Sequence, residues 1–81
     1  MRKPVSLMSK INIFFRLTAE EKTSPELWIV AESMHEHGKE LFRVLCKEPE
    51  NLEFIDHIKI CPACEIAFLR YLDKMMELAD G

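Results

Sequence analysis

Apolar residues recur every three or four positions through the middle of the chain, between Pro25 and about Cys46. On a helix they share one face and charged residues lie opposite, which is the period of an amphipathic helix packed on a core. Ser24-Pro25-Glu26 supplies the start, because serine caps free amides, proline suits the first helical position and glutamate complements the helix dipole. The pattern predicts one long helix with the apolar face Leu27, Val30, Ala31, Met34, Gly38, Leu41, Phe42 and Leu45.

Two further helices are predicted downstream. Glu48-Pro49-Glu50 marks a turn and restarts a short helix, whose apolar positions are Leu52, Ile55 and Ile58. Pro62 ends that helix, because the residue before a proline is pushed out of the helical region. Pro62 then opens a last helix, which we expect to run to about Ala79.

The last helix has an apolar arc of roughly 200°, wider than the stripe of at least ~100° that is typical of a surface helix. Two interpretations fit this width. The helix is either the centre of the fold, wrapped by the N-terminal segment, or it presents a partner-binding face. The arc comprises Ala67, Phe68, Leu69, Tyr71, Leu72, Met75, Met76, Leu78 and Ala79.

The segment from Val5 to Leu17 fits both a helix and a strand. We favour a helix, because a lone strand in a helical chain would need a partner edge. The expected fold is therefore all-α, a small bundle of three to four helices. Its expected parts are an N-terminal segment over residues 1–24 and a helical domain over residues 25–81, which also contains the candidate chemistry described below.

Charge is unevenly placed in this chain of 81 residues with net charge −3, because every acidic residue lies beyond Leu17. A nucleic-acid binder normally shows a basic face, so we expect no direct contact with nucleic acid. The acidic body favours a protein partner with a basic surface. A merely solvated acidic surface is the other interpretation.

The three cysteines cannot all pair within one chain, and no stretch has the order of a secretory signal. The longest apolar run, Ile66 to Leu69, is far shorter than the ~20 residues of a membrane span. These features predict a soluble protein of a reducing cytoplasm.

The most informative stretch for chemistry runs from His57 to Cys64 and reads His-Ile-Lys-Ile-Cys-Pro-Ala-Cys. Two cysteines three apart can turn both sulfurs to one ion, and a histidine one turn earlier reaches the same side. Cys61 takes the cap position of the last helix, where free amides favour the thiolate that binds zinc. The spacing predicts a zinc site lacking one ligand. The alternative is three small buried thiols and histidines on a wet surface.

Three residues are candidates for the fourth ligand: His35, His37 and Cys46. An antiparallel pairing about a turn centred on Glu48 places Cys61 beside His35. Cys46 would lie at the turn, about 16 Å from His35 along a helix, so these two cannot share an ion. His35 and His37 flank the apolar face on opposite sides, and periodicity alone does not choose between them.

The motif resembles the zinc-associated anti-sigma domain, whose hallmark is His-x-x-x-Cys-x-x-Cys at a helix junction, preceded on an earlier helix by a histidine or cysteine. The resemblance covers about residues 35–80 and implies that His57, Cys61 and Cys64 are zinc ligands. The family's upstream ligand is followed by a set of apolar positions. Counted from His35, these are Gly38, Leu41, Phe42, Leu45 and Cys46, so His35 matches better than His37.

The resemblance implies a non-enzymatic regulator in which zinc joins a helical hairpin to the last helix. It would bind and occlude a sigma factor of RNA polymerase, with Phe68, Leu72, Met75 and Met76 as the docking residues. A redox-responsive variant, in which oxidation of the two motif cysteines releases zinc, stays open. The alternative is a homo-oligomeric or phage-like adaptor, with structural or no metal, that assembles through the last helix and the N-terminal segment.

Overall fold

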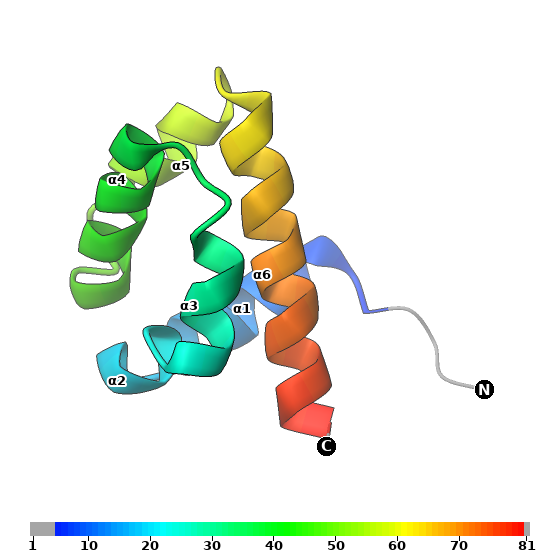
Figure 1. Ribbon diagram of the computed structural model, residues 1–81. Coiled ribbons are helices and arrows are strands. Elements are labelled where there is room, and N and C mark those ends of the chain that lie inside the picture. Colours follow the sequence, from blue (N-terminus) through cyan, green and yellow to red (C-terminus); the bar gives the residue numbers. More distant parts are fainter. Residues whose placement is uncertain (1–4, 81) are drawn as a thin grey trace.

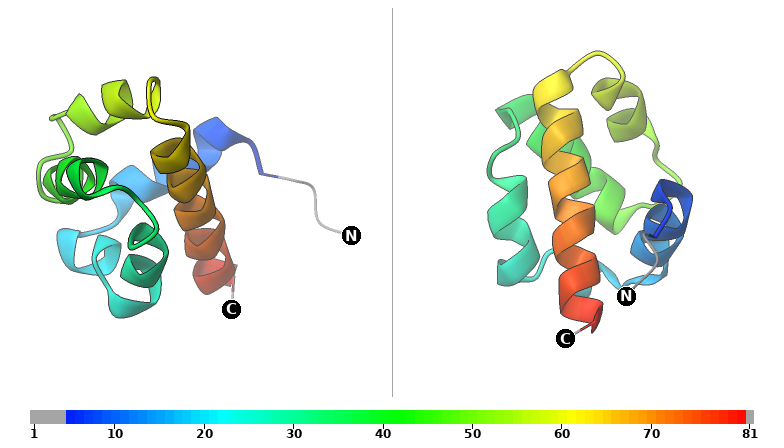
Figure 2. Two further views of the ribbon diagram at one scale, coloured as in Figure 1. Left: turned by 45° about the horizontal axis from the view of Figure 1, so that its top comes forward. Right: turned by 90° about the vertical axis from the view of Figure 1, so that its right-hand side faces the viewer.

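The computed structural model describes residues 5–80, which form helices and no strand (Figure 1). The all-α class is confirmed, with more helices than the three to four expected. They are α1 (Leu7–Arg16), α2 (Ala19–Lys22), α3 (Pro25–Ala31), α4 (Glu36–Lys47), α5 (Glu53–Ile58) and α6 (Pro62–Asp80). Helix α6 packs against α1, α3 and α5, and α4 packs against α5 and α2. Figure 2 shows α6 running the length of the molecule with the shorter helices around it.

The N-terminal segment forms a helix, as favoured over a strand. The Ser6 hydroxyl caps α1 by accepting a hydrogen bond from the Ser9 amide at 3.2 Å. Phe14 is fully buried in the same core as α3 to α6, and Lys10 forms an ion pair with Asp73 of α6 at 2.7 Å. The part of residues 1–24 that the structure describes therefore shares one core with the helical domain.

The single long helix expected from Pro25 to Cys46 is wrong. Helix α3 ends at Ala31, and α4 begins at Glu36 after His35, whose backbone is extended. The Ser33 hydroxyl donates to the Val30 carbonyl at 2.8 Å, a local bond that competes with helix continuation. The turn lets α3 pack on α6 while α4 packs on α5. The second hairpin helix also starts later than expected, at Glu53.

Five buried aromatic side chains from four helices form the aromatic core: Phe14, Phe42, Phe54, Phe68 and Tyr71. Phe42 is its centre, with ring centroids 4.8 to 5.9 Å from those of the other four. The Tyr71 hydroxyl donates to the Lys22 carbonyl at 2.6 Å and so joins α6 to α2. The buried hydroxyl of Tyr71 therefore has a hydrogen-bond partner.

The last helix confirms the interpretation of a central helix. Phe68, Leu72 and Met75 are at most 3% exposed, and Met76 is half-buried. Because α1 and α3 pack on α6, these three side chains are core residues and form no exposed partner face. Phe68 and Leu72 are therefore buried too deeply to serve as docking residues, whereas Met75 lines a groove and Met76 is half-buried.

Candidate metal centre

Three potential metal ligands meet where the start of α4 lies beside the start of α6. His35 is the N-cap residue of α4, Cys61 directly precedes α6, and Cys64 lies in the first turn of α6. Their ligand atoms all lie within 4.8 Å of one another, and Cys61 Sγ is 3.6 Å from His35 Nδ1. This His-Cys-Cys group could hold a metal ion. Both chain segments lie at the end of the molecule drawn at the top of Figure 1.

His57 lies beside this group and has an unsatisfied nitrogen. Its Nε2 is buried and has no hydrogen-bond partner among the described residues. Leaving such an atom unpaired costs about 1–3 kcal/mol. The predicted ligand His57 is not part of the His-Cys-Cys group, although its Nε2 and Cys64 Sγ both face Gly38. Two thiols, one imidazole and a neighbouring imidazole nitrogen are a donor set that fits a metal.

Gly38 makes room for the cluster. A Cβ atom on Gly38 would clash with Cys64 Sγ and would lie 3.0 Å from His57 Nε2. The thiol and the imidazole therefore flank the same point on α4, although they come from α6 and α5. Gly38 has no positive φ, so the position needs its small size rather than its conformational freedom.

The electrostatics of Cys64 oppose ionisation of the free thiol. Burial raises the pKa of Cys64, a hydrogen bond from the His35 backbone opposes this, and neighbouring Cys61 raises the pKa further. A divalent cation reverses this balance, because it stabilises both thiolates at once. The arrangement suits two thiols that ionise only when they bind a metal.

The other two candidates for the fourth ligand lie outside the group. His37 is exposed, and its ring packs edge-on against His57 with 5.4 Å between centroids. Cys46 is buried in the hydrophobic core, where burial raises its pKa to about 12. Of His35, His37 and Cys46, the structure brings only His35 to the two motif cysteines.

Sequence reasoning placed Gly38 on an apolar helix face and missed its role. The available signal was a glycine inside a helical pattern, which costs helix stability and usually has a packing reason. Reasoning also missed the positions of Arg43 and Lys47 beside Trp28. The two bases are four residues apart on a polar helix face, but their approach to Trp28 depends on the α3–α4 turn.

The chain is thus a small all-α protein with a His-Cys-Cys group that could hold a metal ion. No protein-family model, curated protein or solved structure matches it. Within residues 5–80, no helix combines the length and apolar character that crossing a membrane requires.

Proposed function

We propose that the chain is a non-enzymatic regulator that holds one Zn²⁺ through His35, His57, Cys61 and Cys64. The observation that carries the proposal is the buried, unpartnered Nε2 of His57 beside the His-Cys-Cys group. Two imidazole nitrogens and two thiolates are a typical donor set for tetrahedral structural zinc. Four protein ligands leave no open position for a substrate or water, which supports a structural rather than a catalytic ion.

Zinc would join three chain segments that are far apart in sequence: the α3–α4 turn, α5 and the start of α6. A structural zinc supplies about 10 kcal/mol or more of folding free energy. A domain of this length buries only roughly 60% of the surface of its unfolded chain, so the contribution is large. Its structural effect would be to set the angle between the α4–α5 hairpin and α6.

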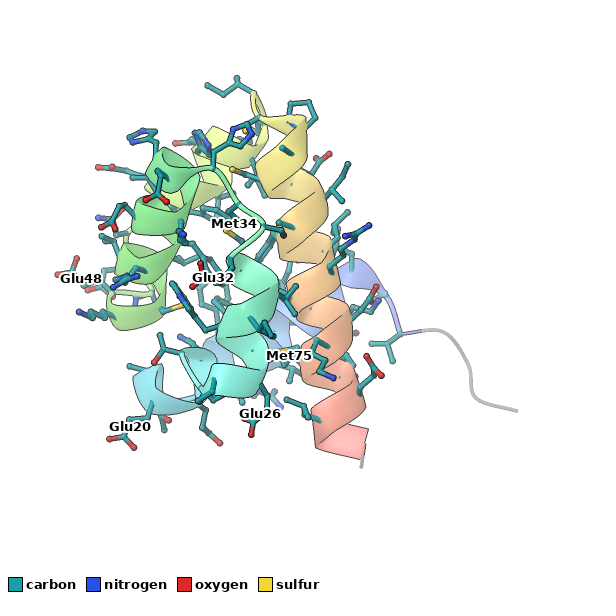
Figure 3. All side chains as sticks on the ribbon, viewed as in Figure 1. Glu20, Glu26, Glu32, Met34, Glu48 and Met75 are labelled. Carbon is teal, nitrogen blue, oxygen red and sulfur yellow. The ribbon has the colours of Figure 1, made fainter. Side chains whose placement is uncertain are left out.

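The resemblance to zinc-associated anti-sigma domains makes a sigma factor the proposed partner. An apolar groove at the C-terminal end of α6 supports a docking site, lined by Ile13, Leu17, Glu21, Ser24, Leu27, Met75, Leu78 and Ala79. Figure 3 shows Glu20 and Glu26 at the end of the molecule below Met75. An apolar groove with Glu21 in its lining, at the end of the molecule that carries Glu20 and Glu26, fits an amphipathic, basic segment of a partner.

The metal assignment is tested by native mass spectrometry of protein purified without chelator. We expect one zinc ion per chain in the wild type and its loss in His57→Ala and Cys61→Ser. His37→Ala is the matched control, because it removes an exposed histidine beside the site and should retain zinc. A metal-free wild type, or zinc retained by both ligand variants, would contradict the assignment.

The partner is tested by biolayer interferometry against purified sigma factors. Leu78→Asp places a charge in the groove and should weaken binding about tenfold or more. Ile29→Asp is the matched control, because Ile29 is an exposed apolar residue outside the groove. If the zinc-loaded protein binds no sigma factor, the proposed partner is wrong, and the proposed metal site is unaffected.

A second candidate, self-assembly, has one observation in its favour. Leu7 of α1 and Leu69 of α6 are exposed and line one shallow pocket, and Ile66 lies exposed one turn from Leu69. Light scattering separates the two candidates. A dimer that persists on dilution and dissociates in Leu69→Glu supports self-assembly, whereas a wild-type monomer rules it out.

A further inference from the structure

A second pocket lies at the opposite end of α4 from His35. It has a volume of about 300 Å³ and is lined by Thr23, Trp28, Arg43 and Lys47. These residues come from the α2–α3 connection, α3 and the second half of α4. The pocket shares no residue with the zinc site or with the apolar groove.

The basic residues along one side of α4 differ in whether they form ion pairs. Lys39, Arg43 and Lys47 are spaced by four and share one side of the helix. Lys39 forms ion pairs with Glu32 at 3.1 Å and Glu36 at 3.3 Å. Neither Arg43 nor Lys47 forms an ion pair with a carboxylate of residues 5–79. Two cations that form no ion pair with a carboxylate of these residues therefore line one pocket of an acidic chain.

The guanidinium of Arg43 lies over the aromatic wall of the pocket. The guanidinium carbon of Arg43 lies 5.1 Å from the centroid of the Trp28 ring. Trp28 in turn stacks on buried Phe42, with 5.8 Å between centroids and 16° between planes. A guanidinium held over an aromatic ring keeps the N–H donors at its edge available for a planar or tetrahedral anion.

A third base, Lys22, adjoins the pocket residue Thr23 in the sequence. Lys22, only 1% exposed, precedes Thr23 and forms no ion pair with a carboxylate of residues 5–79. Its Nζ lies 4.9 Å from the centroid of the Phe14 ring. Burial raises the pKa of Cys46, and the charges of Lys22 and Arg43 both oppose that rise, so both cations lie near the same thiol.

We propose that the pocket of Thr23, Trp28, Arg43 and Lys47 binds the phosphate group of a small phosphate monoester or of free phosphate. Arg43 would donate two parallel hydrogen bonds to two phosphate oxygens, and Lys47 would supply a point charge. The Thr23 hydroxyl already donates to the Ala19 carbonyl at 2.9 Å, so the donors come from the two bases. The volume lies at the lower end of the range for small-molecule sites.

The test uses the single tryptophan of the chain as a probe inside the pocket. Inorganic phosphate and phenyl phosphate are titrated into the full chain, and Trp28 fluorescence is recorded with sodium chloride of equal ionic strength as the control. We expect a saturable change with phosphate and none with chloride. Tighter binding of phenyl phosphate identifies an organic monoester as the ligand, and equal binding identifies the free anion. No saturation below about 10 mM for either probe overturns the proposal.

Variants separate a specific site from general attraction by positive charge. Amide chemical shifts follow phosphate binding here, because changes at Arg43 alter the fluorescence of Trp28 itself. We expect Arg43→Ala and Lys47→Ala each to weaken binding about tenfold or more, and Arg43→Lys to weaken it through loss of the paired donors. Lys39→Ala is the matched control, because it removes a neutralised base of the same helix. An equal loss in Lys39→Ala overturns the proposal.

Discussion

Phe42 and Gly38 lie one turn apart on α4, yet the regions that they face are built differently. Phe42 faces the aromatic core, where apolar rings pack on each other and the Tyr71 hydroxyl has its hydrogen-bond partner. Gly38 faces two ionisable groups, the Cys64 thiol and a His57 nitrogen that has no partner. The aromatic core is complete with the side chains it contains. Within residues 5–80 the His57 nitrogen lacks a hydrogen-bond partner, and the proposed metal ion would supply one.

Removal of zinc should have the largest effect and should separate the two regions. Chelation of the proposed zinc removes its contribution to the folding free energy. We expect hydrogen exchange to show lost amide protection over residues 35–38 and 57–64, with more protection retained in α1 and the second half of α6. Equal loss of protection in both regions would mean that the aromatic core also depends on the metal.

Phe42→Ala alters the aromatic core and leaves the residues of the His-Cys-Cys group unchanged. It leaves a cavity at the centre of the aromatic core and should lower the free energy of unfolding by about 3–5 kcal/mol. Urea unfolding of the zinc-loaded protein measures this value. The zinc content of the folded variant should stay at one ion per chain, because no cluster ligand is changed. Loss of zinc from folded Phe42→Ala would show that the two regions are not independent.

Raising the pH should show how burial of the Cys46 thiol in the aromatic-core region contributes to stability. Burial raises the pKa of Cys46 from 9.0 to about 12, so the folded state holds this proton more tightly than the unfolded state. The stabilisation is complete below pH 9 and is lost as the pH rises toward 12. We expect the wild type to lose up to about 1.4 kcal/mol more per pH unit in this window than Cys46→Ala. Parallel urea titrations compare the two, and equal slopes would contradict the burial effect.

Gly38→Ala should have the smallest effect of the four and acts only at the metal centre. Alanine is better than glycine in a helix by up to about 1 kcal/mol, so propensity alone predicts stabilisation. The added Cβ meets Cys64 Sγ and His57 Nε2, and overpacking of this kind costs about 1–3 kcal/mol. We expect weaker zinc binding, measured by competition with a chromophoric chelator. Unchanged zinc affinity would show that the thiol and imidazole can move aside.

Local signals predicted the helix starts and the central part of the metal motif. Pro25 and Pro62 begin α3 and α6 where proline is expected, and the spacing of Cys61 and Cys64 places both sulfurs at one point. These features depend on residues only a few positions apart. Local signals did not decide α1, because its segment fits both a helix and a strand, and helix was favoured because a lone strand would need a partner edge.

Tertiary structure determined what the sequence pattern left open. The break before His35 was missed because the apolar period continues through it, and Met34 is buried on either interpretation. The break contains neither glycine nor proline. Likewise, the apolar arc of α6 does not state which residues α1 and α3 cover, because that depends on contacts between segments distant in the chain.

The turn between α3 and α4 also explains how so short a chain encloses a core. An unbroken helix over residues 25–47 would be about 34 Å long. The molecule measures 38 Å along its longest axis, so such a helix would run nearly its whole length in a straight line. The turn divides this length into two helices, of which α3 packs on α6 and α4 packs on α5. It also places His35 between the two helices, outside regular helix, where its imidazole reaches Cys61 at the start of α6.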